Sequence, residues 1–208
     1  MKWRPGRKLR GLMLFLALSP LFLVALYCSL PWLLITRDVA AVDQGQVDVL
    51  LHCAISPRST ADEYMAALWR QGRGARIVCV SNAVSPEIFP GDFARRHLIE
   101  LGVPESAVDS YHKVRQDCAA PEIRDLAAWG KARGWRSAIM FLRPEDSATQ
   151  LGKAKYYFQR EGISLSVIWR QQDYDELTHD WWKTHWKAQA LVQSGMEKTL
   201  DALYAECR

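Results

Sequence analysis

Residues 75–81 read ARIVCVS and place four apolar residues in succession at positions 77–80. A short strand that is apolar at consecutive positions fits a parallel sheet covered by helices on both faces. Four other short apolar runs also have the character of strands, and they occupy residues 47–53, 107–111, 136–142 and 163–169. The sequence therefore predicts a mainly parallel sheet of about five strands.

Segments with helical character follow each of these strands. They occupy residues 60–71, 91–101, 121–133, 148–161 and 180–205. Gly102, Gly134 and Gly162 directly follow three of them, and glycine is the favoured residue just past the end of a helix. A strict alternation of strand and helix is typical of α/β domains with right-handed crossovers. We therefore expect residues 47–208 to form one doubly wound, Rossmann-like α/β domain.

The N-terminal part has a different pattern. Residues 11–35 include no charged side chain, whereas residues 1–10 contain five basic residues and no acidic one. A membrane-spanning helix needs about 20 apolar residues, and a positively charged flank stays in the cytoplasm. We expect a cytoplasmic leader (1–10), a transmembrane anchor (11–35) in a bacterial inner membrane, a tether (36–46) and a periplasmic domain. A cleaved signal peptide ending near residues 39–41 stays open, although such signals have an apolar core of only about 7–15 residues.

Charge and motifs exclude several kinds of function. The formal net charge of +4 resides largely in the leader, so no basic stripe for nucleic acid is expected on the domain. The fingerprints of dinucleotide-binding domains, P-loops and α/β-hydrolase nucleophile elbows are absent. The five histidines lack metal-ligand spacing, so we predict no metal and no cofactor. The five cysteines form no C-x-x-C pair, and a disulfide between Cys118 and Cys207 stays open.

Polar residues follow the predicted strands, where open α/β sheets bind their ligands. His52, Arg58 and the hydroxyls of the first loop could hold an anion beside a helix N-terminus. Ser81 and Asn82 end the second strand and could bind a polar ligand, although Asn82 also suits a turn.

The third loop offers candidate acids and bases. His112 follows the third predicted strand and is a side chain that titrates near neutral pH. Glu122 is the other candidate acid or base, although a carboxylate in the first turn of a helix is also favoured by the helix dipole.

Several stretches, in this order, resemble the YdcF/SanA/ElyC-like envelope family. They are ARIVCVSN, HLIELGVPESAV, the helix starting at Pro121, KAKYYFQREG, and a WW doublet followed by EKTLDALY, within residues 47–204. The Ser-Gly-Gly of the family is Ser81-Asn82-Ala83 here. Its Ser-x-x-His-x-x-Arg-Ala pattern becomes Ser147 to Ala154, with glutamine at the histidine position and Lys153 at the arginine position. Lysine lacks the planar fork with which arginine binds phosphate in two places.

The resemblance implies work in the cell envelope, linked to peptidoglycan, polysaccharide or lipid-carrier metabolism. We expect a membrane-anchored protein that binds a polar, anionic precursor, either phosphorylated or glycan-linked. The expected ligand-binding residues are Arg58, Ser81, Asn82, Ser147 and Lys153. Two alternatives stay open. One is a hydrolase or transferase that uses Glu122 or His112. The other is a non-catalytic accessory subunit that docks an envelope or exopolysaccharide protein through Trp181, Trp182 and Trp186.

Overall fold

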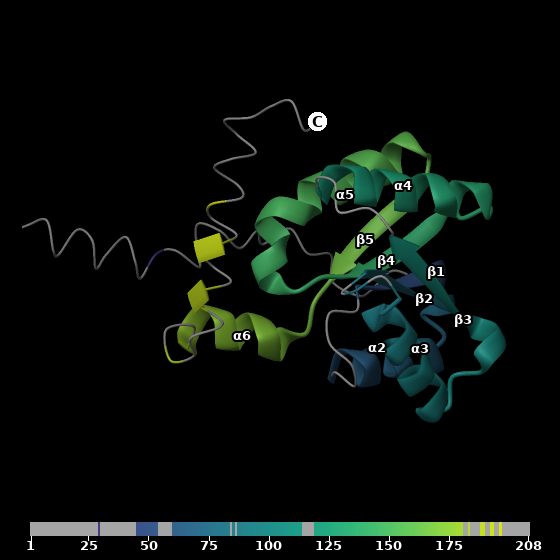
Figure 1. Ribbon diagram of the computed structural model, residues 1–208, viewed down its shortest axis with the longest axis horizontal. Coiled ribbons are helices and arrows are strands. Elements are labelled where there is room, and N and C mark those ends of the chain that lie inside the picture. Colours follow the sequence, from purple (N-terminus) through teal and green to yellow (C-terminus); the bar gives the residue numbers. More distant parts are fainter. Residues whose placement is uncertain are drawn as a thin grey trace, which may run out of the picture.

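The structure is a computed structural model, and it describes residues 29, 45–53, 60–83, 85, 87–113, 119–180, 183, 188–189, 192–193 and 196. Strands and helices alternate along these residues (Figure 1). The strands are β1 (Val47–Cys53), β2 (Gly74–Asn82), β3 (Val108–Lys113), β4 (Ser137–Phe141) and β5 (Ser164–Ile168). The α-helices are α2 (Thr60–Arg70), α3 (Pro90–Glu100), α4 (Ala119–Ala132), α5 (Ser147–Arg160) and α6 (Gln171–Asp180).

The five strands form one parallel sheet in the order β3-β2-β1-β4-β5. The chain winds outward from β1 to β3 and then returns to β4 on the other side of β1. The strand order thus reverses between β1 and β4, which is the position where doubly wound domains leave a crevice at the carboxyl ends of their strands. The predicted α/β class and the predicted parallel sheet are confirmed.

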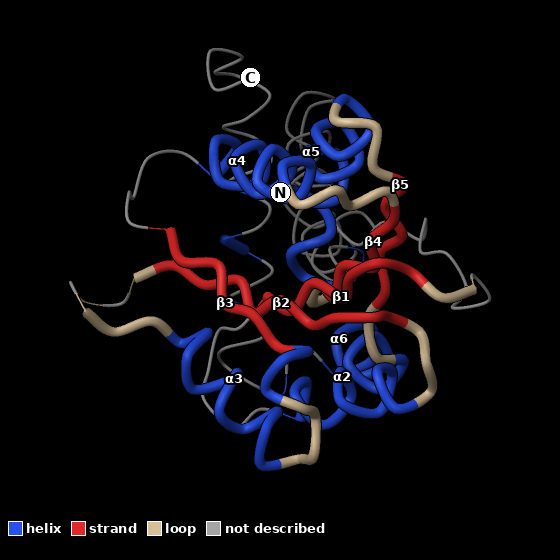
Figure 2. Tube along the Cα trace, turned by 90° about the vertical axis from the view of Figure 1, so that its right-hand side faces the viewer, coloured by secondary structure: helices blue, strands red, loops and turns tan. Residues whose placement is uncertain are grey.

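Helices cover both faces of the sheet (Figure 2). Helices α4 and α5 lie over one face, where Phe158 packs against Leu51, Val78 and Met140 of the strands. Helices α2 and α3 lie over the other face, which buries Leu50, Ile77, Cys79, Ile139, Phe141, Met65 and Leu98. Successive strand residues point to opposite faces, so a sheet covered on both sides needs apolar residues at consecutive positions.

The ends of β1 and β3 matter for function. The bounds of β1 agree with the predicted strand at 47–53, and His52 near its end pairs in register with Cys79 on one side and Phe141 on the other. Strand β3 extends two residues beyond the predicted end, because His112 and Lys113 pair in register with Ser81 and Asn82. Both histidines are therefore held by the sheet.

The C-terminal part also differs from prediction. Helix α6 spans Gln171–Asp180, where no helix was expected. The segment is strongly polar, with Leu177 as a buried apolar residue, so it lacks the apolar periodicity that predicts a helix. The helix predicted at 180–205 lies largely outside the described residues. The leader, the anchor at 11–35 except for Ser29, and nearly all of the tether also lie outside them. In the part of the chain that is described, no helix has the length and apolar character needed to cross a membrane.

Candidate functional site

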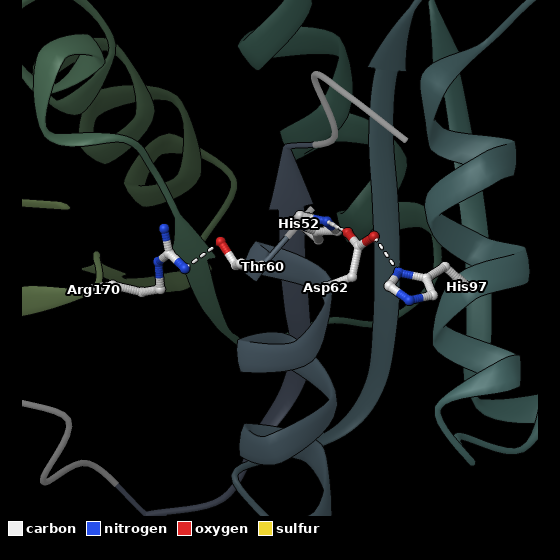
Figure 3. A network of polar contacts seen from close by, with 5 residues as sticks. All are labelled: His52, Thr60, Asp62, His97 and Arg170. Carbon is white, nitrogen blue, oxygen red and sulfur yellow. Dashed lines mark hydrogen bonds and ion pairs between the residues drawn. The ribbon is translucent and has the colours of Figure 1, made fainter. Parts of the chain in front are cut away.

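A buried polar network connects the carboxyl end of β1 with helices α2 and α3 (Figure 3). Asp62 lies in the first turn of α2, directly over the sheet. One carboxylate oxygen of Asp62 lies 2.6 Å from Nε2 of His52, and the other lies 2.8 Å from Nδ1 of His97 on α3. His52 and Asp62 are fully buried, whereas the side chain of His97 is 16% exposed. The network therefore leads from the outer surface of α3 to the interior of the fold.

The direction of these two hydrogen bonds depends on the protonation state of Asp62. An ionised carboxylate only accepts hydrogen bonds, so with Asp62 ionised Nε2 of His52 and Nδ1 of His97 each donate an N–H to it. In a neutral imidazole the second nitrogen is then an acceptor. In His52 the second nitrogen is Nδ1, which is buried and has no hydrogen-bond partner among the described residues.

Cys79 lies beside His52 in the sheet and beneath the same helices. Burial raises the pKa of its thiol far above the ordinary value, and the nearby negative charge of Asp62 raises this pKa further. A thiol in this state does not ionise near neutral pH and is a poor nucleophile. Cys79 is therefore a core residue of the α2/α3 side.

Polar contacts continue from the first residue of α2 toward β5. Arg170, which follows β5, donates a hydrogen bond to the Thr60 hydroxyl (Figure 3). It also donates a hydrogen bond to the Asp173 carboxylate. The side chain of Tyr64 on α2 packs against Phe141 at the end of β4. Burial raises the pKa of Tyr64, and the Arg170 charge opposes part of that rise. These contacts connect α2 with the ends of β4 and β5.

A second acid–base pair lies at the carboxyl end of β3. Nε2 of His112 is 2.7 Å from a carboxylate oxygen of Asp92 in the first turn of α3. The His112 side chain is 35% exposed and that of Asp92 is 40% exposed. Phe89 stacks on the His112 ring, with 4.1 Å between the ring centroids and 11° between the planes. The stacked ring and the carboxylate together hold the imidazole in one orientation at the surface.

Ser81 lies next to this pair, and Asn82 follows it at the end of β2. Ser81 pairs in register with His112, and within the part of the chain that the structure describes its buried hydroxyl has no hydrogen-bond partner. Gly91 of α3 lies directly opposite that hydroxyl, since a Cβ atom on Gly91 would come within 2.6 Å of Ser81 Oγ. Asn82 is exposed and pairs in register with Lys113.

The structure brings some of the predicted residues together and separates others. Ser81, Asn82 and His112 lie at one edge of the sheet. Lys153 lies on α5, which packs on the opposite face of the sheet from Ser81, so these two residues do not line one pocket. Ser147 is the first residue of α5, and Glu122 lies in the first turn of α4, both on that opposite side. Arg58 lies outside the described residues.

Three residues of the two hydrogen-bonded groups were not predicted from the sequence, namely Asp62, His97 and Asp92. Asp62 and Asp92 lie in first turns of helices, where carboxylates are common for reasons of helix stability alone. His97 lies near the end of a helix, without any motif around it. Among the described residues, no group of three histidines, cysteines or carboxylates could hold a metal ion.

Comparisons of the chain with models of protein families, with curated proteins and with solved structures find no match.

Proposed function

We propose that this chain is a membrane-anchored cell-envelope protein whose α/β domain binds a polar, anionic envelope precursor. The precursor belongs to peptidoglycan, polysaccharide or lipid-carrier metabolism and is phosphorylated or glycan-linked. The basic leader, the uncharged segment at 11–35 and the resemblance to the YdcF/SanA/ElyC-like family support this proposal. The domain would then face the periplasm.

The observation that carries the proposal is the exposed His112–Asp92 pair at the carboxyl edge of the sheet. The pair lies beyond the carboxyl ends of the strands, the side on which open α/β sheets bind ligands, and it belongs to the edge strand β3. In its protonated form His112 is a cation that can donate a hydrogen bond to a phosphate oxygen through Nδ1. Asp92 sits at the other ring nitrogen and keeps that imidazole in place.

A hydrolase or transferase acting on such a precursor is the second candidate, and the same pair favours it. A histidine oriented by a carboxylate is suited to general acid–base catalysis, which typically contributes 10²- to 10⁴-fold in rate. His112 would move the proton and Asp92 would hold the ring. The alternative of an accessory subunit stays a prediction, because Trp181, Trp182 and Trp186 lie outside the described residues.

Ligand-dependent stabilisation tests the proposal. The full chain in mild detergent is unfolded thermally with N-acetylglucosamine 1-phosphate or a polyprenyl phosphate analogue present. Ligand at about 100 times its dissociation constant should stabilise the protein by about 2.7 kcal/mol. His112→Gln should remove most of this gain.

The matched control is Asp109→Asn, because Asp92→Asn and Asp109→Asn each remove one carboxylate from an exposed ion pair. Asp109 pairs with Arg76 at 2.9 Å and is 41% exposed, close to the 40% of Asp92, but it lies near the amino end of β3. We expect Asp92→Asn to weaken binding and Asp109→Asn to leave it unchanged. The proposal is wrong if no phosphorylated ligand stabilises the protein. It is also wrong if the ligand stabilises the His112→Gln variant as much as the wild type.

A further inference from the structure

Exposed basic side chains gather at the edge of the sheet where the strands begin. In a parallel α/β domain each crossover helix ends near this edge, because the next strand starts there. Helices α2, α4 and α5 therefore bring their last turns to it, and the segment between α4 and β4 lies beside them. The exposed basic residues at these positions, which we call the amino face, are Arg70, Lys131, Arg133, Arg136 and Arg160.

Contacts show that segments carrying the amino face lie side by side. The N–H of Arg136 donates to the Asp48 carboxylate at 2.7 Å, and the carbonyl oxygen of Arg136 accepts from the N–H of Ser164 at 2.8 Å. A Cβ atom on Gly162 would lie 3.5 Å from Nζ of Lys131. The end of α4 is therefore next to the starts of β1 and β5.

The positive charge of the amino face is not neutralised by ion pairs. Among the described residues, none of its side chains forms an ion pair with a carboxylate. The carboxylates at this edge of the sheet are Asp48, Glu100, Glu105, Asp109 and Glu161. Two of them are paired with other arginines, Glu105 with Arg95 and Asp109 with Arg76. Asp48 accepts two backbone hydrogen bonds.

The carboxyl edge of the sheet differs in this respect. Arg143 pairs there with Asp146, and Arg170 pairs with Asp173. A helix dipole favours a cation in the last turn, which accounts for part of the amino face. Arg136, however, lies beyond the end of α4, where the dipole contributes little. The unpaired charge of the amino face therefore indicates an anionic partner.

The chain enters the domain at this same face. Gly45 and Gln46 are exposed and lead into β1, and the N–H of Val47 donates to the carbonyl oxygen of Arg73 at 2.9 Å. The predicted anchor ends at residue 35, and the ten residues from there to Gly45 span at most about 35 Å when fully extended. A membrane that holds the anchor is therefore close to the amino face.

We propose that the amino face docks on the anionic phospholipid headgroups of the membrane that holds the anchor, an inference that rests on the anchor of the proposed function. Lipid phosphates accept charge-assisted hydrogen bonds from guanidinium and ammonium groups. Each basic residue near an anionic bilayer surface favours the docked state about fivefold.

Docking also sets the direction in which the candidate site faces. The nine residues of β2 span about 30 Å from the amino edge of the sheet to the carboxyl edge. With the amino face on the bilayer, His112 faces away from it. A ligand of His112 then reaches the site from the aqueous side and not from the bilayer surface.

Chemical labelling of arginines in nanodiscs tests the docking. The full chain is placed in nanodiscs of phosphatidylcholine alone or of equal parts phosphatidylcholine and phosphatidylglycerol, and mass spectrometry follows its reaction with phenylglyoxal. Labelling of Arg70, Arg136 and Arg160 should be about fivefold slower or more in the anionic nanodiscs. The difference should vanish in 1 M NaCl, where the Debye length is about 3 Å. The internal control is Arg124, which is 57% exposed and lies in the first half of α4, away from the amino face.

A pair of variants with equal net charge separates docking from general attraction to anionic lipid. Arg70→Glu combined with Arg160→Glu should abolish the slower labelling of Arg136. Arg96→Glu combined with Arg124→Glu should preserve it, because Arg96 bonds to the carbonyl oxygen of Asp92 in the first turn of α3 and points toward the carboxyl edge. If Arg136 is labelled equally fast in both kinds of nanodisc, or if Arg124 is slowed as much as Arg136, the inference is wrong.

Flotation of the full chain with vesicles tests the anchor separately. A chain that floats with phosphatidylcholine vesicles in 1 M NaCl is anchored, and equal labelling in the two nanodiscs then overturns this inference alone. A chain that salt removes from these vesicles has no anchor, and that part of the proposed function fails. Docking is still supported in that case if the chain floats with anionic vesicles and salt releases it, and it is overturned if the chain floats with neither.

Discussion

Replacement of Asp62 by alanine should strongly destabilise the fold. The substitution removes a fully buried carboxylate that accepts two hydrogen bonds, at 2.6 and 2.8 Å, from imidazoles on two other elements. Hydrogen bonds to a charged group contribute about 1.5–3 kcal/mol each, and removal of one partner from a buried pair costs about 3–5 kcal/mol. We therefore expect a loss of about 3–5 kcal/mol, or a fall in Tm on the order of 6–20 °C.

Urea unfolding followed by tryptophan fluorescence measures this loss, because Trp135 is buried in the core. The urea concentration at the midpoint should fall, while the dependence of the free energy of unfolding on urea concentration stays the same. This combination indicates a change in stability and not in the unfolded state. Asp62→Asn keeps one acceptor oxygen and should lose roughly half as much. The control is Asp109→Ala, whose exposed ion pair contributes about 1 kcal/mol or less. If Asp62→Ala costs no more than Asp109→Ala, the network does not hold α2 and α3 against β1.

Three further results are expected. Gly130→Ala should cost about 1–3 kcal/mol and shift tryptophan emission, because the added Cβ would lie 2.1 Å from the ring of Trp135; unaltered emission and stability would contradict this packing. Asp48 accepts two backbone hydrogen bonds that hold its pKa below the ordinary 3.8. Its contribution to the stability of the fold is therefore complete above about pH 4 and is lost as the pH falls through the lowered pKa. The stability of Asp48→Asn should accordingly depend less on acid than that of the wild type, and parallel acid-unfolding curves would refute this. Cys79 should resist iodoacetamide at pH 8 in the folded protein, because burial raises its pKa; rapid labelling seen by mass spectrometry would show that the core opens.

The order of elements followed from local sequence signals. Consecutive apolar residues in short runs predicted buried parallel strands, and all five strands are present. The glycines expected just past helices, Gly102, Gly134 and Gly162, all adopt positive φ, which other residues rarely adopt. These signals depend on neighbouring residues only, which is why they can be read along the chain. Helix α6 was missed because its residues are mostly polar and its start carries no such signal.

The candidate site could be predicted only in part. His112 and Ser81 were selected because they follow strands, and the strand order brings them side by side. The expected pocket of Ser81 with Lys153 does not form, because α3 and α5 cover opposite faces of the sheet. The side of the sheet on which a helix packs depends on the winding of the whole chain, and no local pattern specifies it.

The sequence by itself determined the α/β class, the number of strands and the edge of the sheet where polar side chains gather, because hydrophobic periodicity and helix-ending glycines act over a few residues. Only the tertiary structure decided that Asp62 lies between His52 and His97, residues that are 10 and 35 positions away in the chain. A carboxylate in the first turn of a helix is stable in solvent or buried between imidazoles. The packing of α2 and α3 over β1 removes it from water and makes it the centre of a buried network.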